Sequence, residues 1–144
     1  MATQSITLNS NFDTPEAAYR YACDGWRGQY PPAEPIIAQS SRYSYLYARF
    51  ILKGRFPPGE PAIAQTSYWA FLYARDVVGR FPLGEPAIAQ SPRWALQYCH
   101  EITGSRLPAA EPVIAADPDA ARLYVNRFRS QFTEHEKVLW LLKI

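Results

Sequence analysis

Apolar residues recur along this chain at helical spacing, each time after a residue that can cap a helix. The five capping residues are Thr14, Ser40, Thr66, Ser91 and Asp117. Apolar or small side chains follow each of them three, four, seven, eight and eleven positions later, with Gly25 as the exception, so they share one face of a helix. The residue at position seven is always tyrosine: Tyr21, Tyr47, Tyr73, Tyr98 and Tyr124. The pattern predicts five helices of about three turns each.

Each predicted long helix is followed by a stop signal and a connector. Glycine stands at the expected end of four helices (Gly28, Gly54, Gly79 and Gly104), where its freedom to adopt a left-handed backbone suits a C-cap. An aromatic residue or leucine and then proline come next, and proline holds the residue before it in an extended conformation. A Glu-Pro pair then opens a segment such as EPAIAQ, which we expect to form a helix of one or two turns.

Helices and connectors together make a repeating unit. The Glu-Pro pairs begin at Glu34, Glu60, Glu85 and Glu111, in steps of 26, 25 and 26 residues. Self-similarity at such a period indicates a repeat architecture. One unit of short helix, turn and longer helix cannot bury its apolar face alone, but stacked neighbours can. The sequence therefore predicts an all-α solenoid of four to five repeats of about 26 residues.

The two ends of the chain depart from the repeat. Residues 1–13 are mostly polar, and we expect either a flexible tail or a short extended segment over the first repeat. The array itself should span residues 14–132. Residues 133–144 start with a capping-box pattern, Thr133 with Glu136 three positions later, and continue into an apolar helix. That helix either caps the array or docks onto a second copy of the chain.

Composition narrows the classes of function. The net charge of +2 gives no strong electrostatic footprint for nucleic acid, although a local basic stripe remains open. The two cysteines lie three repeats apart, too far for a disulfide, which favours reduced thiols. The sequence contains neither a run of about 20 apolar residues nor a secretory signal. We therefore expect a cytoplasmic protein without a membrane partner.

The repeated motif is similar to repeats in other proteins. The stretch EPAIAQSPRWALQY, with its GRFP connector, resembles a short tandem repeat of uncharacterised proteins from bacteriophages and large viruses, over residues 14 to about 130. In kind, the two-helix unit is similar to tetratricopeptide, Sel1-like and HEAT arrays, although its period is shorter than the tetratricopeptide one. The resemblance implies a phage or viral accessory protein, acting in the host cytoplasm, and transfers no catalytic residue.

The residues that repeat most strictly invite two interpretations. The tyrosine column could stack on unpaired bases, but tyrosine in the middle of an apolar stripe favours a ring in the core and a hydroxyl bonded to backbone or glutamate. The glutamate column could hold a cationic partner. We favour instead a role at the helix starts, or pairing with Arg55, Arg80 or Arg106.

The residues that vary between repeats are the candidates for function. Arginine recurs two and nine positions after the caps, opposite the core stripe, and with nearby aromatic residues it could form a basic and aromatic strip. An ordinary solvated face is the alternative. The candidate partner-binding residues are Arg42, Tyr45, Arg49, Tyr68, Phe71, Arg75, Arg93, Leu96 and His100.

No set of residues in the sequence is typical of an enzyme. The two histidines have no ligand spacing, the serines serve as caps, and the glycines are helix stops and do not form a phosphate-binding loop. We therefore expect no catalytic residue, no metal and no cofactor. The best interpretation is a helical-repeat scaffold that binds another protein. The alternatives are binding of RNA or single-stranded DNA by the basic and aromatic face, and a homo-oligomer assembled through the C-terminal helix.

Overall fold

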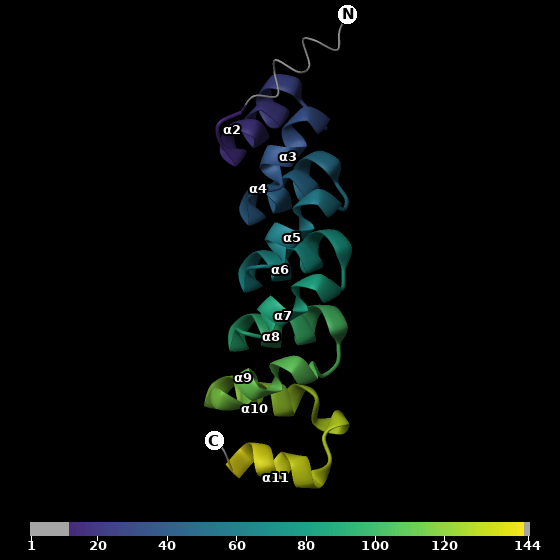
Figure 1. Cartoon of the computed structure of the whole chain (residues 1–144). Helices are drawn as coiled ribbons and strands as arrows, with labels where there is room; N and C mark the ends of the chain where they lie inside the picture. Colours follow the sequence, from purple (N-terminus) through teal and green to yellow (C-terminus); the bar gives the residue numbers. More distant parts are fainter. Residues whose placement is uncertain (1–11, 143–144) are drawn as a thin grey trace, which may run out of the picture.

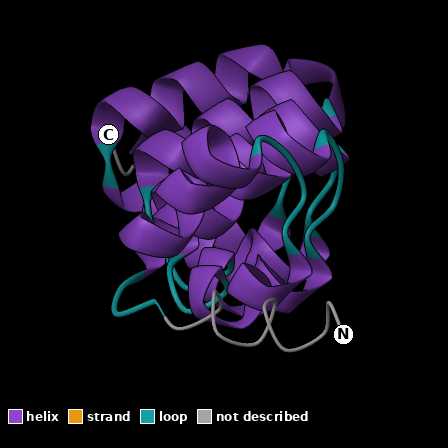
Figure 2. Ribbon diagram, turned by 90° about the horizontal axis from the view of Figure 1, so that it is seen from above, coloured by secondary structure: helices purple, strands orange, loops and turns teal. Residues whose placement is uncertain are grey.

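The computed structural model describes residues 12–142, and in that range the chain is all helix and loop, with no strand (Figure 2). The helical units stack one after another in sequence order along a single axis (Figure 1). This confirms the predicted all-α repeat fold. The expected N-terminal tail, residues 1–13, lies almost entirely outside the described residues. No described helix is both long enough and apolar enough to cross a membrane.

Each of the first four long helices starts as an α-helix and finishes as a π-helix. The pairs are α2 (Pro15–Arg20) with η1 (Tyr21–Trp26), α4 (Ser41–Leu46) with η3 (Tyr47–Leu52), α6 (Ser67–Tyr73) with η5 (Ala74–Val78), and α8 (Pro92–Tyr98) with η7 (Cys99–Thr103). The fifth, α10 (Pro118–Arg127), is α-helical throughout. The sequence pattern predicted the helices but not the wider final turn, because the apolar spacing of the two helix types is similar over so few residues.

Four of the five predicted caps are present. The side chains of Thr14, Ser40, Ser91 and Asp117 each accept a hydrogen bond from the backbone N–H three residues later. Such a bond satisfies one of the amides that a helix start leaves free. The prediction for Thr66 is wrong in this detail, because its side chain makes no cap hydrogen bond although its backbone takes the extended cap conformation.

The predicted glycine caps are correct in two repeats and wrong in two. Gly79 and Gly104 have positive φ, of 77° and 63°. In the first two repeats the left-handed residue is the one before glycine, Arg27 (φ 64°) and Lys53 (φ 53°). These repeats have one more residue between cap and glycine, 14 positions instead of 13. All four helices end 12 positions after their cap, so in the first two repeats the residue that follows the helix comes one position before the glycine.

Replacing Lys53 with glycine should therefore stabilise the protein. A non-glycine residue in the left-handed region costs about 1–2 kcal/mol, and glycine gives back about 0.5–1 kcal/mol in unfolded-state entropy, so the net gain should be about 0.5–1 kcal/mol. Denaturant unfolding would measure it. Val78→Gly is the matched control, since Val78 also precedes a glycine but ends η5 without a positive φ. It should destabilise, and a loss with Lys53→Gly would contradict the argument.

The connectors are more regular than the sequence predicted. Each short α-helix is preceded by one turn of 3-10 helix that starts at the connector proline. The short helices are α3 (Glu34–Ile37), α5 (Glu60–Ile63), α7 (Glu85–Ile88) and α9 (Glu111–Ala116), and the turns are η2 (Pro31–Ala33), η4 (Pro57–Gly59), η6 (Pro82–Gly84) and η8 (Pro108–Ala110). The glutamate of every Glu-Pro pair is the first residue of its helix, as expected.

The core runs without a break along the stack. Every short helix buries its isoleucine completely, and four of the five tyrosines, all but Tyr21, are fully buried with them. Small residues four positions after the caps, such as Ala70 and Ala95, are also fully buried and let neighbouring helices approach closely. The tyrosine column is thus part of the core and is closed to unpaired bases.

The last helix, α11 (Glu134–Leu142), follows the turn η9 (Arg129–Gln131) and packs against α10 (Figure 1). Trp140 stacks on Tyr124, with ring centres 5.4 Å apart, and lies edge-on to Phe132. The predicted capping box is confirmed, because Thr133 N–H donates to the Glu136 carboxylate at 2.8 Å and Glu136 N–H donates to Thr133 Oγ1 at 3.1 Å. This helix therefore covers the end of the array.

Candidate binding face of the long helices

The repeated tyrosine holds its long helix, through its hydroxyl, to the connector and short helix that precede it. The hydroxyl of Tyr73 accepts a hydrogen bond from the Phe56 backbone N–H at 3.0 Å and donates one to the Glu60 carboxylate at 2.7 Å. Tyr47, Tyr98 and Tyr124 make the same two bonds to their own connectors. Each tyrosine thereby satisfies a buried amide 17 residues earlier in the chain.

The repeated glutamate completes this arrangement with an arginine. Arg55 binds Glu60 through two hydrogen bonds, at 2.9 and 2.8 Å, and Arg80 binds Glu85 in the same way. The first repeat has Gln29 in place of the arginine, and its amide donates to Glu34 at 3.3 Å. The predicted Glu–Arg pairing is therefore confirmed. These carboxylates bind side chains of their own chain, and do not form an acidic ladder for a partner.

Hydrogen bonding favours the ionised form of two glutamates of the column, Glu60 and Glu85. Burial acts to raise the pKa of Glu60, but the hydrogen bonds from Arg55 and Tyr73 outweigh it and lower that pKa below its usual 4.5. Hydrogen bonding from Arg80 likewise lowers the pKa of Glu85. Burial raises the pKa of the Tyr73 hydroxyl to about 12, so this donor stays protonated at neutral pH.

Stability should consequently fall in acid. A carboxyl whose folded-state pKa is depressed adds stability above its unfolded pKa and loses it as the pH falls through the folded value. We expect the thermal midpoint, followed by circular dichroism, to change little between pH 7 and pH 6 and to drop below about pH 4.5. The variant Glu60→Gln with Glu85→Gln should start less stable at pH 7 and show a shallower drop. An equally steep drop would place the acid sensitivity elsewhere.

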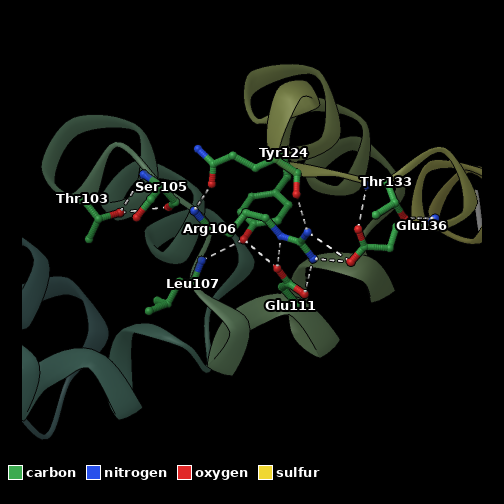
Figure 3. A network of polar contacts seen from close by, with 9 residues as sticks. Thr103, Ser105, Arg106, Leu107, Glu111, Tyr124, Thr133 and Glu136 are labelled. Atoms are coloured by element: carbon green, nitrogen blue, oxygen red, sulfur yellow. Dashed lines mark hydrogen bonds and ion pairs between the residues drawn. The ribbon is translucent and has the colours of Figure 1, made fainter.

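In the last repeat the glutamate–arginine pair gains a second glutamate (Figure 3). Arg106 binds Glu111 at 2.7 Å through Nε, and both of its terminal nitrogens lie 3.1 Å from a Glu136 oxygen. Its guanidinium lies 3.8 Å from the centre of the Phe132 ring. One arginine thus connects the final repeat to the start of α11.

The candidate partner-binding residues divide by exposure. Arg42, Arg49, Tyr68, Arg75, Arg93 and His100 are exposed on the long helices. Leu96 is half-buried. The expectation that Tyr45 and Phe71 lie on the open outer face is wrong, because they are only 3% and 2% exposed. Rings from the next repeat cover them, so their position in the repeat could not reveal their burial.

Two of the exposed arginines are bound to an acid that sequence reasoning missed. Asp76 accepts hydrogen bonds from Arg49 at 2.8 Å, from Arg75 at 2.8 and 3.0 Å, and from the Tyr45 hydroxyl at 2.6 Å. Hydrogen bonding from Arg75 is the largest influence on Asp76 and lowers its pKa. Arg49 is 27 residues from Asp76, one more than most repeat steps, so aligned repeats do not place the two in one column.

Aromatic pairs fill the outer face between the first four long helices. The residue three positions after each cap lies against the residue five positions after the previous cap. The pairs are Tyr43 with Tyr19 at 5.6 Å, Trp69 with Tyr45 at 5.5 Å and Trp94 with Phe71 at 5.3 Å between ring centres. Pairs of this kind favour offset or edge contacts and fill these three grooves at the level of the rings. Farther along the first groove, a hollow of about 530 Å³ remains between η1 and η3, lined by Cys23, Asp24, Arg27, Gly28, Phe50, Ile51 and Lys53.

The fourth groove, between α8 with η7 and α10, is open. The residues at the two equivalent positions are Ala120, which is buried, and Leu96, which borders a hollow of about 330 Å³. Its lining residues are Arg93, Leu96, Gln97, His100, Leu123 and Arg127. Three of them were predicted, whereas Gln97, Leu123 and Arg127 were not. The signal that could have found them is Ala120, the point where the aromatic series ends.

Hydrogen bonding fixes the geometry of two lining residues. Arg127 donates from Nε to His100 Nδ1 at 2.8 Å, so His100 accepts with that nitrogen and carries its proton on the other. The terminal nitrogens of Arg127 have no hydrogen-bond or ion-pair partner among residues 12–142. Arg93 lies over the Trp94 ring at 4.8 Å and also forms no ion pair within that range. Two guanidinium groups are thus available beside the hollow.

Other candidate chemistry is not assembled in this face. Within the described range, no three His, Cys, Asp or Glu side chains gather as metal ligands would. Cys23 and Cys99 are both free, and burial raises the pKa of the Cys99 thiol to about 11, which keeps it protonated and unreactive. The hollow with its two arginines is therefore the main candidate for a site.

No family model, curated protein or solved structure matches this chain. The resemblance of its repeat to those of bacteriophage and large-virus proteins accordingly rests on the repeat motif alone. The fold shown is an all-α tandem helical repeat, and the function must be argued from the face of the long helices.

Proposed function

We propose that this protein is a non-catalytic scaffold that binds another protein through the outer face of its long helices. The observation that carries the proposal is that repeated and variable positions differ in their contacts. The strictly repeated polar groups bind one another, as in Tyr73 with Glu60, whereas the exposed groups at the hollow vary from repeat to repeat. Helical-repeat arrays commonly bind partners through such an extended face. The resemblance to phage and large-virus repeats makes a host protein the partner we propose first.

A photo-crosslinking experiment tests this function. A photoreactive amino acid replaces Tyr68, which is 42% exposed on a long helix, or Pro61, which is exposed on the short helix α5. We expect position 68, but not position 61, to capture a specific protein in extract of the native cell, identified by mass spectrometry. The same products at both positions, or none at either, would refute a binding face on the long helices.

Binding of RNA or single-stranded DNA is the alternative that this face supports less well. The acid Asp76 holds Arg49 and Arg75, and Tyr45 and Phe71 are buried, which withdraws groups that would contact phosphates and bases. Nucleic-acid binding would weaken steeply as salt rises and would fall on replacing Arg49 and Arg75 with alanine. Recovery of nucleic acid with those two properties would favour this alternative over a protein partner.

Self-assembly is a second alternative that one observation favours. The helix α11 leaves Val138, Leu139, Leu141 and Leu142 between 46% and 77% exposed, an apolar surface large enough to attract a second copy. In that case the chain should be dimeric in light scattering, and Leu139→Lys should make it monomeric. A monomer at high protein concentration would end this alternative.

A further inference from the structure

The open groove lacks two groups found in earlier grooves, one of them in all three and the other in the groove between α4 and α6. The first is an aromatic ring. Trp94 covers Phe71 in the groove before it, at 5.3 Å between ring centres, whereas Ala120 stands in the place of that tryptophan and leaves Leu96 uncovered. The hollow therefore lies beside Leu96, which has no ring of the chain over it, and beside Leu123.

The second missing group is a carboxylate. Asp76, ten positions after its cap, binds Arg49 of the preceding repeat and its own neighbour Arg75. Its equivalent in the last repeat is Arg127, which contacts His100 of the preceding repeat. The change from acid to arginine removes the carboxylate and leaves a cationic rim, completed by Arg93. A guanidinium group with no acidic partner among residues 12–142 is suited to a carboxylate.

We propose that this hollow binds a peptide segment of another protein in which an aromatic side chain stands next to a carboxylate. The proposal rests on the scaffold function and names the chemistry of the partner. The aromatic ring packs against Leu96 and Leu123, as Trp94 packs against Phe71 in the preceding groove. The carboxylate takes the place of Asp76 and is bound by Arg127 and Arg93.

Three synthetic peptides test the two parts of this chemistry on the full chain. They are acetyl-Ser-Glu-Trp-Glu-Ser-amide, its variant with both glutamates changed to glutamine, and its variant with tryptophan changed to alanine. We expect the first peptide to shift the amide NMR signals of Leu96, His100 and Leu123. Its dissociation constant, obtained from those shifts, should be at least tenfold lower than that of either variant. Equal binding by all three, shifts confined to other surfaces, or no shifts at millimolar peptide would overturn the proposal.

Variants of the protein locate the site. Arg127→Glu should weaken the first peptide at least tenfold, whereas Arg122→Glu, the same charge change on an exposed side chain of the same helix, should leave it unaffected. Leu123→Ala should remove one apolar wall of the hollow and weaken the peptide, and the protein should keep its thermal stability because Leu123 is 58% exposed. Equal loss with Arg127→Glu and Arg122→Glu would mean that net charge, not the hollow, binds the peptide.

The two proposals fail in different ways. A protein that is captured at position 68, and whose binding is unchanged by Arg127→Glu and Leu123→Ala, would overturn the hollow as its binding site and keep the scaffold function. Absence of any captured protein would overturn the scaffold function itself, whatever the peptides do. Loss of the captured protein with both variants, together with the peptide preference, would support both.

Discussion

Replacing Tyr73 with phenylalanine should lower the free energy of unfolding by about 2 kcal/mol, or roughly 4–8 °C in thermal midpoint. The ring stays and only the hydroxyl is removed, so the packing of the core is unchanged. The loss arises because the buried Phe56 N–H keeps no acceptor and the Glu60 carboxylate loses a donor. Leaving a buried polar group unsatisfied costs more than the average hydrogen bond contributes. Urea unfolding followed by circular dichroism measures the change.

Tyr68→Phe is the control for this experiment. Tyr68 is 42% exposed, and its hydroxyl makes no hydrogen bond within residues 12–142. Surface changes of this kind stay within about 0.5 kcal/mol. Tyr98→Phe should behave like Tyr73→Phe, because its hydroxyl bonds Phe81 N–H and Glu85 in the same geometry. If Tyr73→Phe cost no more than Tyr68→Phe, the hydroxyl would not be holding α6 to its connector and short helix.

The tyrosine column also shows why the sequence predicted the repeat fold so well. Tyr73 recurs with Glu60 at a fixed separation because both serve the same contact in every unit, so the contact leaves a periodic trace. The repeat, its two helices and the Glu–Arg pairing could all be found from that trace. The π-helical turns could not, because the carbonyl of Ala74 bonds Gly79 in one repeat and that of Ala48 bonds Gly54 in another, one residue farther on. Only the folded backbone shows where the additional residue is absorbed.

The candidate site was harder to predict for a different reason. Its contacts join unlike positions of neighbouring repeats, as Arg127 and His100 do at a separation of 27 residues. Aligned repeats place such residues in separate columns, where each looks like unconstrained variation. Tyr45 and Phe71 were misjudged in the same way, since the rings that bury them belong to the next unit. The informative residue was Ala120, which stands where the earlier repeats have an aromatic residue. Its consequence, that Leu96 has no ring over it, shows only when the repeats are stacked.

The second large effect should follow from replacing Arg106 with glutamine. Arg106 is the arginine of the last Glu–Arg pair, and its side chain is 19% exposed, compared with 63% for Arg80. It binds Glu111, Glu136 and the Gln131 carbonyl at once. Hydrogen bonds to charged groups contribute about 1.5–3 kcal/mol, so removing this set should cost about 2 kcal/mol. Urea unfolding measures the loss.

Arg80→Gln is the matched control, because the first repeat already has glutamine at this place and Gln29 still reaches Glu34. An exposed arginine with a single partner should be replaced there with little change in stability. The contrast between the two variants isolates the additional contacts of Arg106 with Glu136, the Gln131 carbonyl and the Phe132 ring. Equal effects at both positions would mean that these contacts contribute nothing.

Hydrogen exchange distinguishes a local from a global effect of Arg106→Gln. Glu136 completes the capping box with Thr133 at the start of α11, and Arg106 holds its carboxylate in place. Without the arginine, the amides of α11 should exchange faster than those of α6 and α8, because the end helix opens before the array unfolds. Uniform acceleration along the chain would mean instead that α11 and the repeats unfold as one unit. In that case the end helix would be a fully cooperative part of the solenoid, with its stability determined by the whole stack.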